Sequence, residues 1–509
     1  MGGDPGPETV KKPQGILEYL HQIFNRSAFT LIHVSMDFKK ELSLFDLTNI
    51  IVGSVIGADI YIASAITAGM LGPFSLVVWV IAGIFATVIA LVFAYCSYYV
   101  PKVGGPFAYV SEAFDDFFGF LTGWSMWVAE LISLPVFAIA FVRYLEYLLP
   151  LAMHEEILVK GIFLFGLTAI NIYGVKMAGR VNDALTLIKL APLLLLIGAG
   201  IIFFVMQPAG FFNNYSPFVP LGVSATGTAL VLIFWAYAGF ELGTLPAAEV
   251  KDPKTTIPKA IIIGMAIVAL FYISTNIIVY GAVNWAGLAQ SQTPLILVGG
   301  VLLGSAGALI MTVGALFSVS GSDESGMLGT GRLSYAMSVD GLFPRLFSAI
   351  HPKYGTPYAG LVIQGILAFL LSIYSPITGL ISFAVFNLAF SFLLTCFALV
   401  VLSKESERQL PGQKILPWTG VAICLYLLYA TSMFDKVVGT IIILAGVLIY
   451  IFFSPKQDIF HLKQMFLSEE AIFFRAMDKR ERFLGNFMLI LYRVYEQVRR
   501  KLIPGPRNP

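Results

Sequence analysis

One short apolar stretch of the chain carries groups that could bind a ligand inside a membrane. In "IVGSVIGADIYIAS", residues 51–64, two glycines, Gly53 and Gly57, are followed by the carboxylate of Asp59. A glycine weakens a helix by about 1 kcal/mol relative to alanine, and a charged side chain at the bilayer centre costs roughly 3 kcal/mol or more. A break in a helix here would expose N–H and C=O groups that a ligand in a cavity can satisfy. The alternative is close packing of helices through small residues.

Lys189 is a second candidate, because it lies in the apolar segment "TLIKLAPLLLLIG", residues 186–198. If Arg180 marks the inner boundary of the membrane, the nine residues between them rise about 13–14 Å along a helix. Lys189 would then lie near mid-membrane, too deep to reach the interface easily, although a snorkelling lysine is the alternative. A lysine removed from water loses its proton more readily than one at the surface, which suits it to carry a coupling proton.

The apolar segments also contain five acidic side chains near their middle, against one basic residue there, Lys189. They are Asp59, Glu130, Glu241, Asp323 and Glu324. Acidic side chains that face a common cavity would lower the energy of a cation and disfavour an anion. We therefore expect a ligand with an extra positive charge. Alternatively, these acids share protons with one another or bond to serines and water.

Membrane helices must position these side chains, because the whole chain is too apolar for a soluble protein. Of its 509 residues 58% are hydrophobic and 12% are charged, with a mean hydropathy of +0.83, whereas a soluble protein has about 25% charged residues. The fold class predicted is an all-α polytopic membrane protein, with spans of ~20 residues each. Charge-free stretches and turn signals predict twelve transmembrane helices, at residues 45–70, 75–99, 115–147, 157–174, 181–206, 226–248, 257–283, 295–326, 357–374, 377–402, 415–433 and 436–453.

The basic residues fall mainly on one side of this arrangement. Most of the 32 Lys and Arg residues lie in the N-terminal segment, in the segments after helices 2, 4, 6, 8 and 10, and in the C-terminal tail. Because such segments face the cytoplasm, we expect both termini to be cytoplasmic in a multi-pass protein of the plasma membrane. The predicted domains are a cytoplasmic N-terminal segment at 1–40, a twelve-helix membrane domain at 41–455 and a cytoplasmic amphipathic basic tail at 456–509.

The tail has the pattern of an amphipathic helix. Apolar residues recur at 484, 487, 488, 491, 494, 498 and 502, the spacing of one helical face, and the opposite face ends in Arg499, Arg500 and Lys501. We expect this helix to lie on the anionic inner leaflet. A helix that binds a protein partner is the alternative.

A second weak segment occurs five helices after the first. In "FWAYAGFELGTLPAAEV", residues 234–250, Gly239, Glu241 and Gly243 lie mid-span and Pro246 follows them. Paired interrupted helices at matching places in two halves indicate an inverted-repeat transporter. The first and sixth helices are therefore predicted to be discontinuous.

Four long motifs resemble the amino acid–polyamine–organocation superfamily. They are "GSVIGADIY" at 53–61, "YVPKVGGPFAYVSEAFDDFFGFLTGWSMWV" at 99–128, "FWAYAGFELGTLPAAEVKDPKTTIPKAI" at 234–261 and "GRLSYAMSVDGLFPRLFSAIHPKYGTP" at 331–357. The resemblance covers roughly 41–455. It implies a ten-helix, five-plus-five inverted-repeat core of the leucine-transporter type with two peripheral helices, and secondary transport of an amino acid or amine.

The resemblance also implies the substrate-binding residues. They are Val55, Ile56, Gly57, Ala58, Asp59, Glu130, Trp235, Ala238 and Glu241. A substrate carboxylate would meet the N–H groups of Gly57 to Asp59, and an ammonium would meet carbonyls of both breaks. Trp235 matches an aromatic residue that caps the pocket in relatives, or is a plain core residue. Glu241 could instead be structural and accept N–H bonds exposed by the break.

Asp59 departs from the family pattern, which has glycine at this position and a small polar residue where this chain has Ala58. A carboxylate beside a bound carboxylate is unfavourable by roughly 1–4 kcal/mol at effective dielectric constants of 80 to 20. Three alternatives follow. Asp59 points away from the substrate, it is protonated, or the ligand has no carboxylate there.

Lys189 matches, by resemblance, the lysine that replaces sodium in proton-coupled members of the family. Its partners would be the first-helix carbonyls near 52–55 and hydroxyls of the eighth helix. The predicted proton-coupling set is Lys189, Ser318, Ser320 and Ser322. We therefore expect the proton to be the coupling ion.

Other functional classes find little support in the sequence. It contains no HExxH, GxSxG or phosphate-loop motif, and its five histidines are scattered. We predict a protein that is not an enzyme and uses no metal or other cofactor, with a small-molecule amino acid or amine as substrate, the proton and the lipid bilayer as further partners, and no nucleic acid. A polyamine or organic amine transporter, an amino acid exchanger and a sensor that binds without transport are the alternatives.

Overall fold

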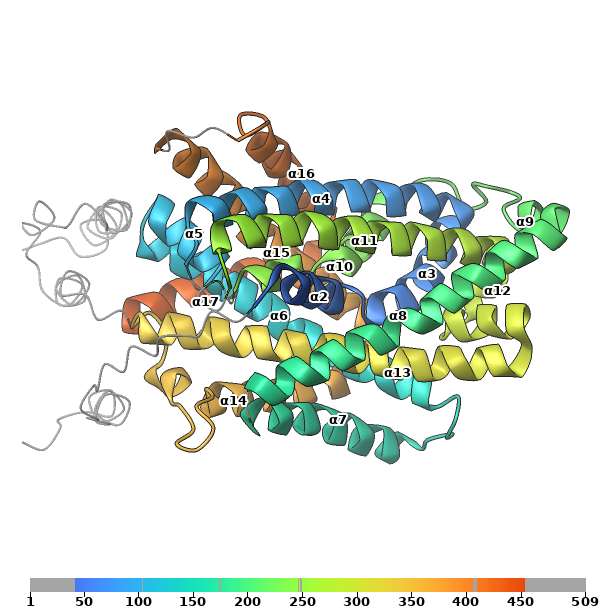
Figure 1. Ribbon diagram of the computed structural model, residues 1–509, viewed down its shortest axis with the longest axis horizontal. Helices are drawn as coiled ribbons and strands as arrows, with labels where there is room; N and C mark the ends of the chain where they lie inside the picture. Colours follow the sequence, from blue (N-terminus) through green and yellow to red (C-terminus); the bar gives the residue numbers. More distant parts are fainter. Residues whose placement is uncertain are drawn as a thin grey trace, which may run out of the picture.

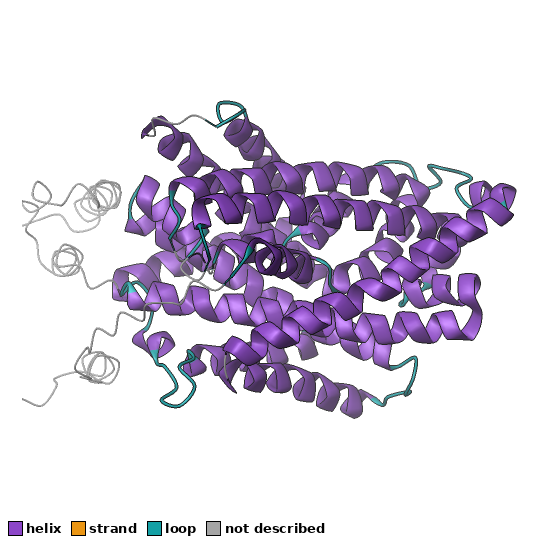
Figure 2. Cartoon of the chain, viewed as in Figure 1, coloured by secondary structure: helices purple, strands orange, loops and turns teal. Residues whose placement is uncertain are grey.

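The computed structural model describes residues 42–453, apart from residues 103, 174, 246, 248, 249 and 406–409. The predicted N-terminal segment at 1–40 and the tail at 456–509, with its amphipathic helix, lie outside the described residues. Within the described part all regular elements are helices (Figure 2). Leu42 and Val250 add one isolated parallel bridge.

The helices follow one another along the chain with short connections. In order they are α2 (Leu44–Val55), α3 (Ala58–Leu71), η1 (Gly72–Phe74), α4 (Ser75–Tyr99), α5 (Pro106–Ala113), α6 (Asp116–Leu145), α7 (Met153–Tyr173), α8 (Val175–Met206), α9 (Pro208–Asn213), α10 (Thr226–Tyr237), η2 (Phe240–Thr244), α11 (Pro253–Ala282), α12 (Trp285–Gln290), α13 (Pro294–Val339), η4 (Arg345–Ser348), α14 (Tyr358–Tyr374), α15 (Ile377–Glu405), α16 (Leu416–Ala430) and α17 (Met433–Phe453). Helix is present in each of the twelve ranges predicted from the sequence.

The chain is built as a polytopic membrane protein. In the described part, nine segments are long and apolar enough to cross a membrane, and one of these, Leu44–Tyr99, contains α2, α3 and α4. The helices α14 and α16 are shorter but also apolar. Mean hydropathy of the nine segments ranges from 1.3 to 2.8, so lipid is the solvent that matches their outer faces.

The short helix α2 lies at the centre of the bundle (Figure 1). It packs against α11 on one side and against α8 and α13 on the other. The residues of its last turn are all buried, with Val52 4% and Val55 2% exposed.

Both predicted discontinuous helices are broken. Helix α2 ends at Val55 and α3 begins at Ala58, with Gly57 at φ −140° and ψ −142° between them. Helix α10 ends at Tyr237, and the chain continues through Gly239, at φ 116°, into the 3-10 turn η2. The helix predicted at 226–248 is thus interrupted as expected, because Gly239 adopts a left-handed conformation that glycine alone tolerates readily.

Two further features differ from the sequence prediction. Helix α13 continues to Val339, beyond the predicted end at 326, and ends at the C-cap Asp340 before Gly341, whose positive φ of 76° is typical of a helix stop. The kink in this long helix is at Gly304, with φ 67°. The connection between the predicted helices at 75–99 and 115–147 contains the separate helix α5, which starts at Pro106, a residue that favours the first turn of a helix.

Candidate functional site

At the first break, Asp59 folds back onto the backbone that the break exposes. Its Oδ1 accepts a hydrogen bond of 2.7 Å from the N–H of Gly57, and its Oδ2 accepts one from the hydroxyl of Tyr272. The side chain is only 3% exposed. A carboxylate at the start of α3 also meets the positive end of the helix dipole. Asp59 therefore caps the break with its own carboxylate.

Tyr272 of α11 is the main site residue that the sequence analysis missed. Its hydroxyl lies 2.9 Å from the carbonyl oxygen of Val55 as well as against Asp59. A hydroxyl has one hydrogen to donate, so two acceptors share a single donor here. The sequence did carry a signal, because Tyr272, Asn276 and Tyr280 recur every four residues and so form a polar stripe on an otherwise apolar helix. In the structure all three contact α2 or α3.

The second break repeats the arrangement of the first. The N–H of Gly239 donates a hydrogen bond of 2.9 Å to Oε2 of Glu241, two residues further along, as the N–H of Gly57 does to Asp59. This contact agrees with the alternative in which Glu241 has a structural role and accepts an N–H group that the break exposes. The other oxygen, Oε1, is buried without a hydrogen bond to any described residue.

Glu130 of α6 lies next to Glu241. Glu130 is 8% exposed and Glu241 is fully buried. Two adjacent carboxyl groups in a dry environment cannot both be ionised without a cation between them. The structure therefore brings two of the five predicted acids together, in a place suited to a proton or a ligand ammonium.

The two breaks touch each other. The hydroxyl of Ser54 donates a hydrogen bond of 2.9 Å to the carbonyl oxygen of Gly239. A Cβ atom at Gly239 would lie 3.1 Å from the backbone carbon and oxygen of Ser54. The second break therefore needs glycine for its dihedral angles and for this close approach.

Replacing Gly239 with alanine is expected to destabilise the protein. A non-glycine residue in a strained dihedral region costs about 1–3 kcal/mol, and the close contact with Ser54 adds to this cost. Thermal unfolding of the purified protein in detergent measures the effect. Gly166→Ala is the matched control, because a Cβ atom there meets nothing within 4 Å. Equal unfolding temperatures for the two variants would contradict the account of the break.

Lys189 of α8 contacts the first break and is fully buried. Its Nζ donates hydrogen bonds to the carbonyl oxygen of Gly53 and, at 3.3 Å, to Oγ of Ser322. The ion pairs within 4.0 Å among the described residues involve Lys102 and Lys160, and Lys189 is in neither of them. Lys189 thus contacts the break through a carbonyl and a hydroxyl.

The three predicted serines of α13 do not behave alike. Ser322 lies 3.0 Å from the carbonyl oxygens of both Gly53 and Ile56, and Ser318 donates to Ile56 at 3.4 Å. Ser320 instead donates to the carbonyl of Leu316 in its own helix. Its side chain points away from the break, because residues two apart on a helix face different directions.

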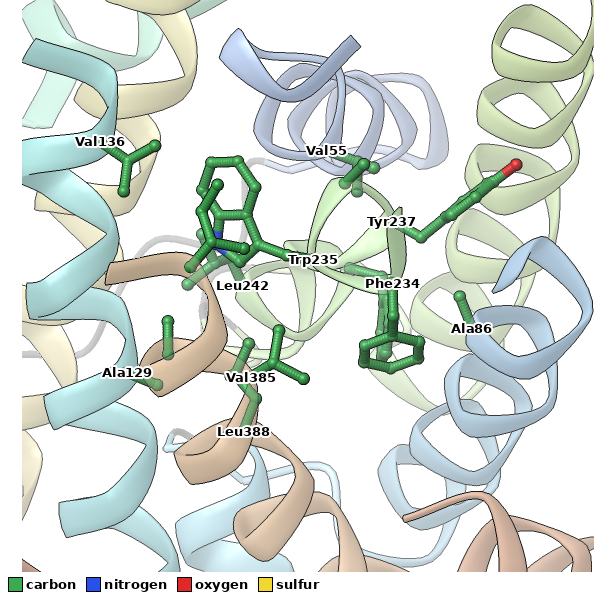
Figure 3. Close-up of a cluster of buried hydrophobic side chains, with 14 of the residues drawn as sticks. Val55, Ala86, Ala129, Val136, Phe234, Trp235, Tyr237, Leu242, Val385 and Leu388 are labelled. Atoms are coloured by element: carbon green, nitrogen blue, oxygen red, sulfur yellow. The ribbon is translucent and has the colours of Figure 1, made fainter. Parts of the chain in front are cut away.

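Trp235 lies at the end of α10 and points toward α6 (Figure 3). Its Nε1 donates a hydrogen bond of 3.1 Å to Oγ of Ser133, and its ring lies 5.7 Å from that of Phe137. In the same view Tyr237 points the opposite way. Trp235 is 6% exposed, so it is buried against α6 through Ser133 and Phe137.

Of the remaining predicted residues, Ala58 and Ala238 lie at the two breaks, whereas Asp323 and Glu324 lie within α13. Ala58 is the fully buried first residue of α3, and Ala238 is extended and donates its N–H to the carbonyl of Trp235 at 3.0 Å. Asp323 and Glu324 are fully buried in the middle of α13. The oxygens of Asp323 have no hydrogen bond to a described residue.

Comparison with known proteins matches the chain over most of its length. The family model described as "Amino acid permease" matches residues 42–455. The branched-chain amino acid permease BcaP of Bacillus subtilis (strain 168) is 28% identical over 447 residues, which cover 82% of this chain and 94% of the relative. The methylthioribose transporter of the same organism is 27% identical over 84% of this chain and 95% of the relative.

A mammalian relative gives a similar result. The large neutral amino acids transporter small subunit 2 of Mus musculus is 30% identical over 435 residues, covering 81% of this chain and 80% of the relative. The family and these relatives are transporters and not enzymes. With its two broken helices in contact inside an apolar bundle, the chain belongs to the amino acid permease family of the amino acid–polyamine–organocation superfamily.

Proposed function

We propose that the protein is a secondary active transporter of amino acids or closely related amines, coupled to protons and favouring cations. The observation that carries this proposal is the contact between two broken helices in the buried centre, where Ser54 bonds to Gly239. Broken helices supply a ligand with unpaired backbone groups at mid-membrane. Membership of the amino acid permease family supports an amino acid or a chemically similar substrate.

The proposed architecture has twelve membrane crossings around a five-plus-five inverted repeat. The break between α2 and α3 would begin one half, and the break between α10 and η2 would begin the other. A carboxylate two residues after the glycine of each break supports this repeat. The proposal keeps both termini in the cytoplasm, the membrane domain at 41–455, and the basic tail on the anionic leaflet of the plasma membrane.

Proton coupling is proposed to act through Lys189. When protonated, its ammonium group donates to the carbonyl of Gly53 and to Ser322, and so ties α8 and α13 to the end of α2. When Lys189 loses its proton, the charge-assisted part of these hydrogen bonds is lost. The first break would then be held less tightly, which links proton release to movement of the break.

The preference for cations is proposed from the acidic groups at both breaks. Asp59 caps the first break, and Glu130 and Glu241 adjoin the second. A ligand cation would offset the repulsion between Glu130 and Glu241. The relative named methylthioribose transporter indicates that substrates in this family need not be α-amino acids.

Counterflow separates transport from the alternative of a sensor that only binds its ligand. Liposomes containing the purified full chain are loaded with unlabelled arginine, lysine, putrescine or leucine and diluted into the same labelled compound. We expect transient accumulation of label with at least one cationic compound. Ligand binding to the purified protein without any counterflow would contradict transport and favour the sensor.

A further inference from the structure

The N–H groups of both break glycines are already paired. A substrate carboxylate at a broken helix needs free N–H donors at the start of the second half-helix. Here Oδ1 of Asp59 takes the N–H of Gly57 at 2.7 Å, and Oε2 of Glu241 takes the N–H of Gly239 at 2.9 Å. The chain has thus placed its own carboxylate on the N–H of Gly57, where the family resemblance puts a ligand carboxylate, and a second one on the N–H of Gly239.

The space beside Gly57 is filled as well. A Cβ atom on Gly57 would lie 2.6 Å from Oγ of Ser322 and 3.0 Å from Oδ1 of Asp59. Ser322 cannot move away freely, because it is hydrogen-bonded to the carbonyls of Gly53 and Ile56. A second carboxylate could enter this position only after Asp59 had left it, and it would meet the charge of Asp59.

Acceptors outnumber donors at both breaks. At the first, the hydroxyl of Tyr272 has one hydrogen for two acceptors, the carbonyl of Val55 and Oδ2 of Asp59. At the second, Oε1 of Glu241 is fully buried next to the carboxyl group of Glu130, so that one proton or one cation between the two groups would serve both. An ammonium group has three donors and no acceptor, so it supplies what these sites lack.

We propose that Asp59 stands in for the substrate carboxylate, so that the ligand is an organic amine without a carboxylate beside its ammonium group. One ammonium would bind Asp59 and the carbonyl of Val55. A second cationic group, ammonium or guanidinium, would bind between Glu130 and Glu241. This inference rests on the proposed transport function and narrows its substrate to decarboxylated amines such as diamines.

Matched ligand pairs test this proposal. Arginine and agmatine, lysine and cadaverine, and ornithine and putrescine differ within each pair only in the α-carboxylate. Their binding to the full chain in lipid nanodiscs is measured by isothermal titration calorimetry. We expect the decarboxylated member to bind at least about tenfold more tightly in each pair, which corresponds to about 1.4 kcal/mol. Equal or tighter binding of the amino acid in the wild type would overturn the proposal.

Two substitutions of Asp59 refine the test. Asp59→Gly removes the built-in carboxylate and restores the glycine of the family pattern, so we expect the preference to shift at least about tenfold toward the amino acid member. Asp59→Asn keeps an oxygen that can accept from Gly57 but removes the charge. We expect Asp59→Asn to weaken the binding of the amine without strengthening the binding of the amino acid. This variant tests the role of Asp59 if Asp59→Gly does not fold. A preference unchanged in the folded variants would overturn the proposal.

Counterflow of the same six compounds separates this inference from the proposed function. Counterflow of the amino acids alone would leave transport standing and refute the role of Asp59. Counterflow of the amines alone would support both. No counterflow of these six compounds, or of leucine, would refute transport and the substrate assignment together.

Discussion

Replacing Lys189 with alanine is expected to abolish substrate accumulation driven by a proton gradient. Lys189 is fully buried and donates to the carbonyl of Gly53 at the first break. Alanine removes the side chain that is proposed to carry the proton and its contact with the break. Uptake of the best counterflow substrate into liposomes with an acidic exterior measures the effect, and we expect it to fall to the level of liposomes without protein.

Lys160→Ala is the matched control for Lys189→Ala. Lys160 is also a buried lysine, 9% exposed, but its contacts are Glu156 at 3.8 Å and the carbonyl of Ser372 at 3.4 Å. It contacts neither break through these bonds, so Lys160→Ala should retain proton-driven uptake. A Lys189→Ala variant that still concentrated substrate under a proton gradient alone would refute the role of Lys189.

Glu130→Gln is expected to weaken the binding of cationic ligands strongly and to spare leucine. The carboxyl groups of Glu130 and Glu241 adjoin each other in a buried site. Removal of one charge reduces the attraction for a cation by roughly 1–4 kcal/mol at effective dielectric constants of 80 to 20. This range corresponds to binding that is weaker by about fivefold to several hundredfold. Competition among arginine, lysine, putrescine, leucine and glutamate measures it.

The stability of the same variant gives an independent check on Glu130. Because Glu130→Gln removes one of two adjacent carboxyl groups, its unfolding temperature should equal or exceed that of the wild type. Glu112→Gln is the control, since Glu112 pairs with Lys102 at 2.5 Å on an exposed surface. If leucine outcompeted every cation on the wild type and Glu130→Gln changed nothing, Glu130 would have only a structural role.

The sequence predicted the helices and their breaks because the signals for both are local. Apolar runs of membrane length define the helices, and Gly57 and Gly239 identify the places where they break. The sequence prediction ends this helix at 326, whereas α13 continues to Val339. Packing against the rest of the protein supports this extension, since Met327, Leu333 and Met337 are buried.

The contacts at the breaks were harder to predict because they join distant residues. Asp59 and Tyr272 are 213 positions apart, and Ser54 and Gly239 are 185 positions apart. The sequence analysis left three alternatives for Asp59. The structure adds its hydrogen bonds from Gly57 and Tyr272 and its burial, none of which is visible in the sequence. Ser320 was grouped with Ser318 and Ser322 by proximity in sequence, although its hydroxyl bonds within its own helix.

The most direct test of the account is accumulation of a cationic substrate by wild-type protein under defined ion gradients. Liposomes containing the full chain are given an inward proton gradient, an inward sodium gradient or neither, at the same membrane potential. The account predicts that labelled substrate rises above its equilibrium level only with the proton gradient. Accumulation driven by sodium alone, or no accumulation under any gradient from a preparation that is active in counterflow, would contradict proton coupling.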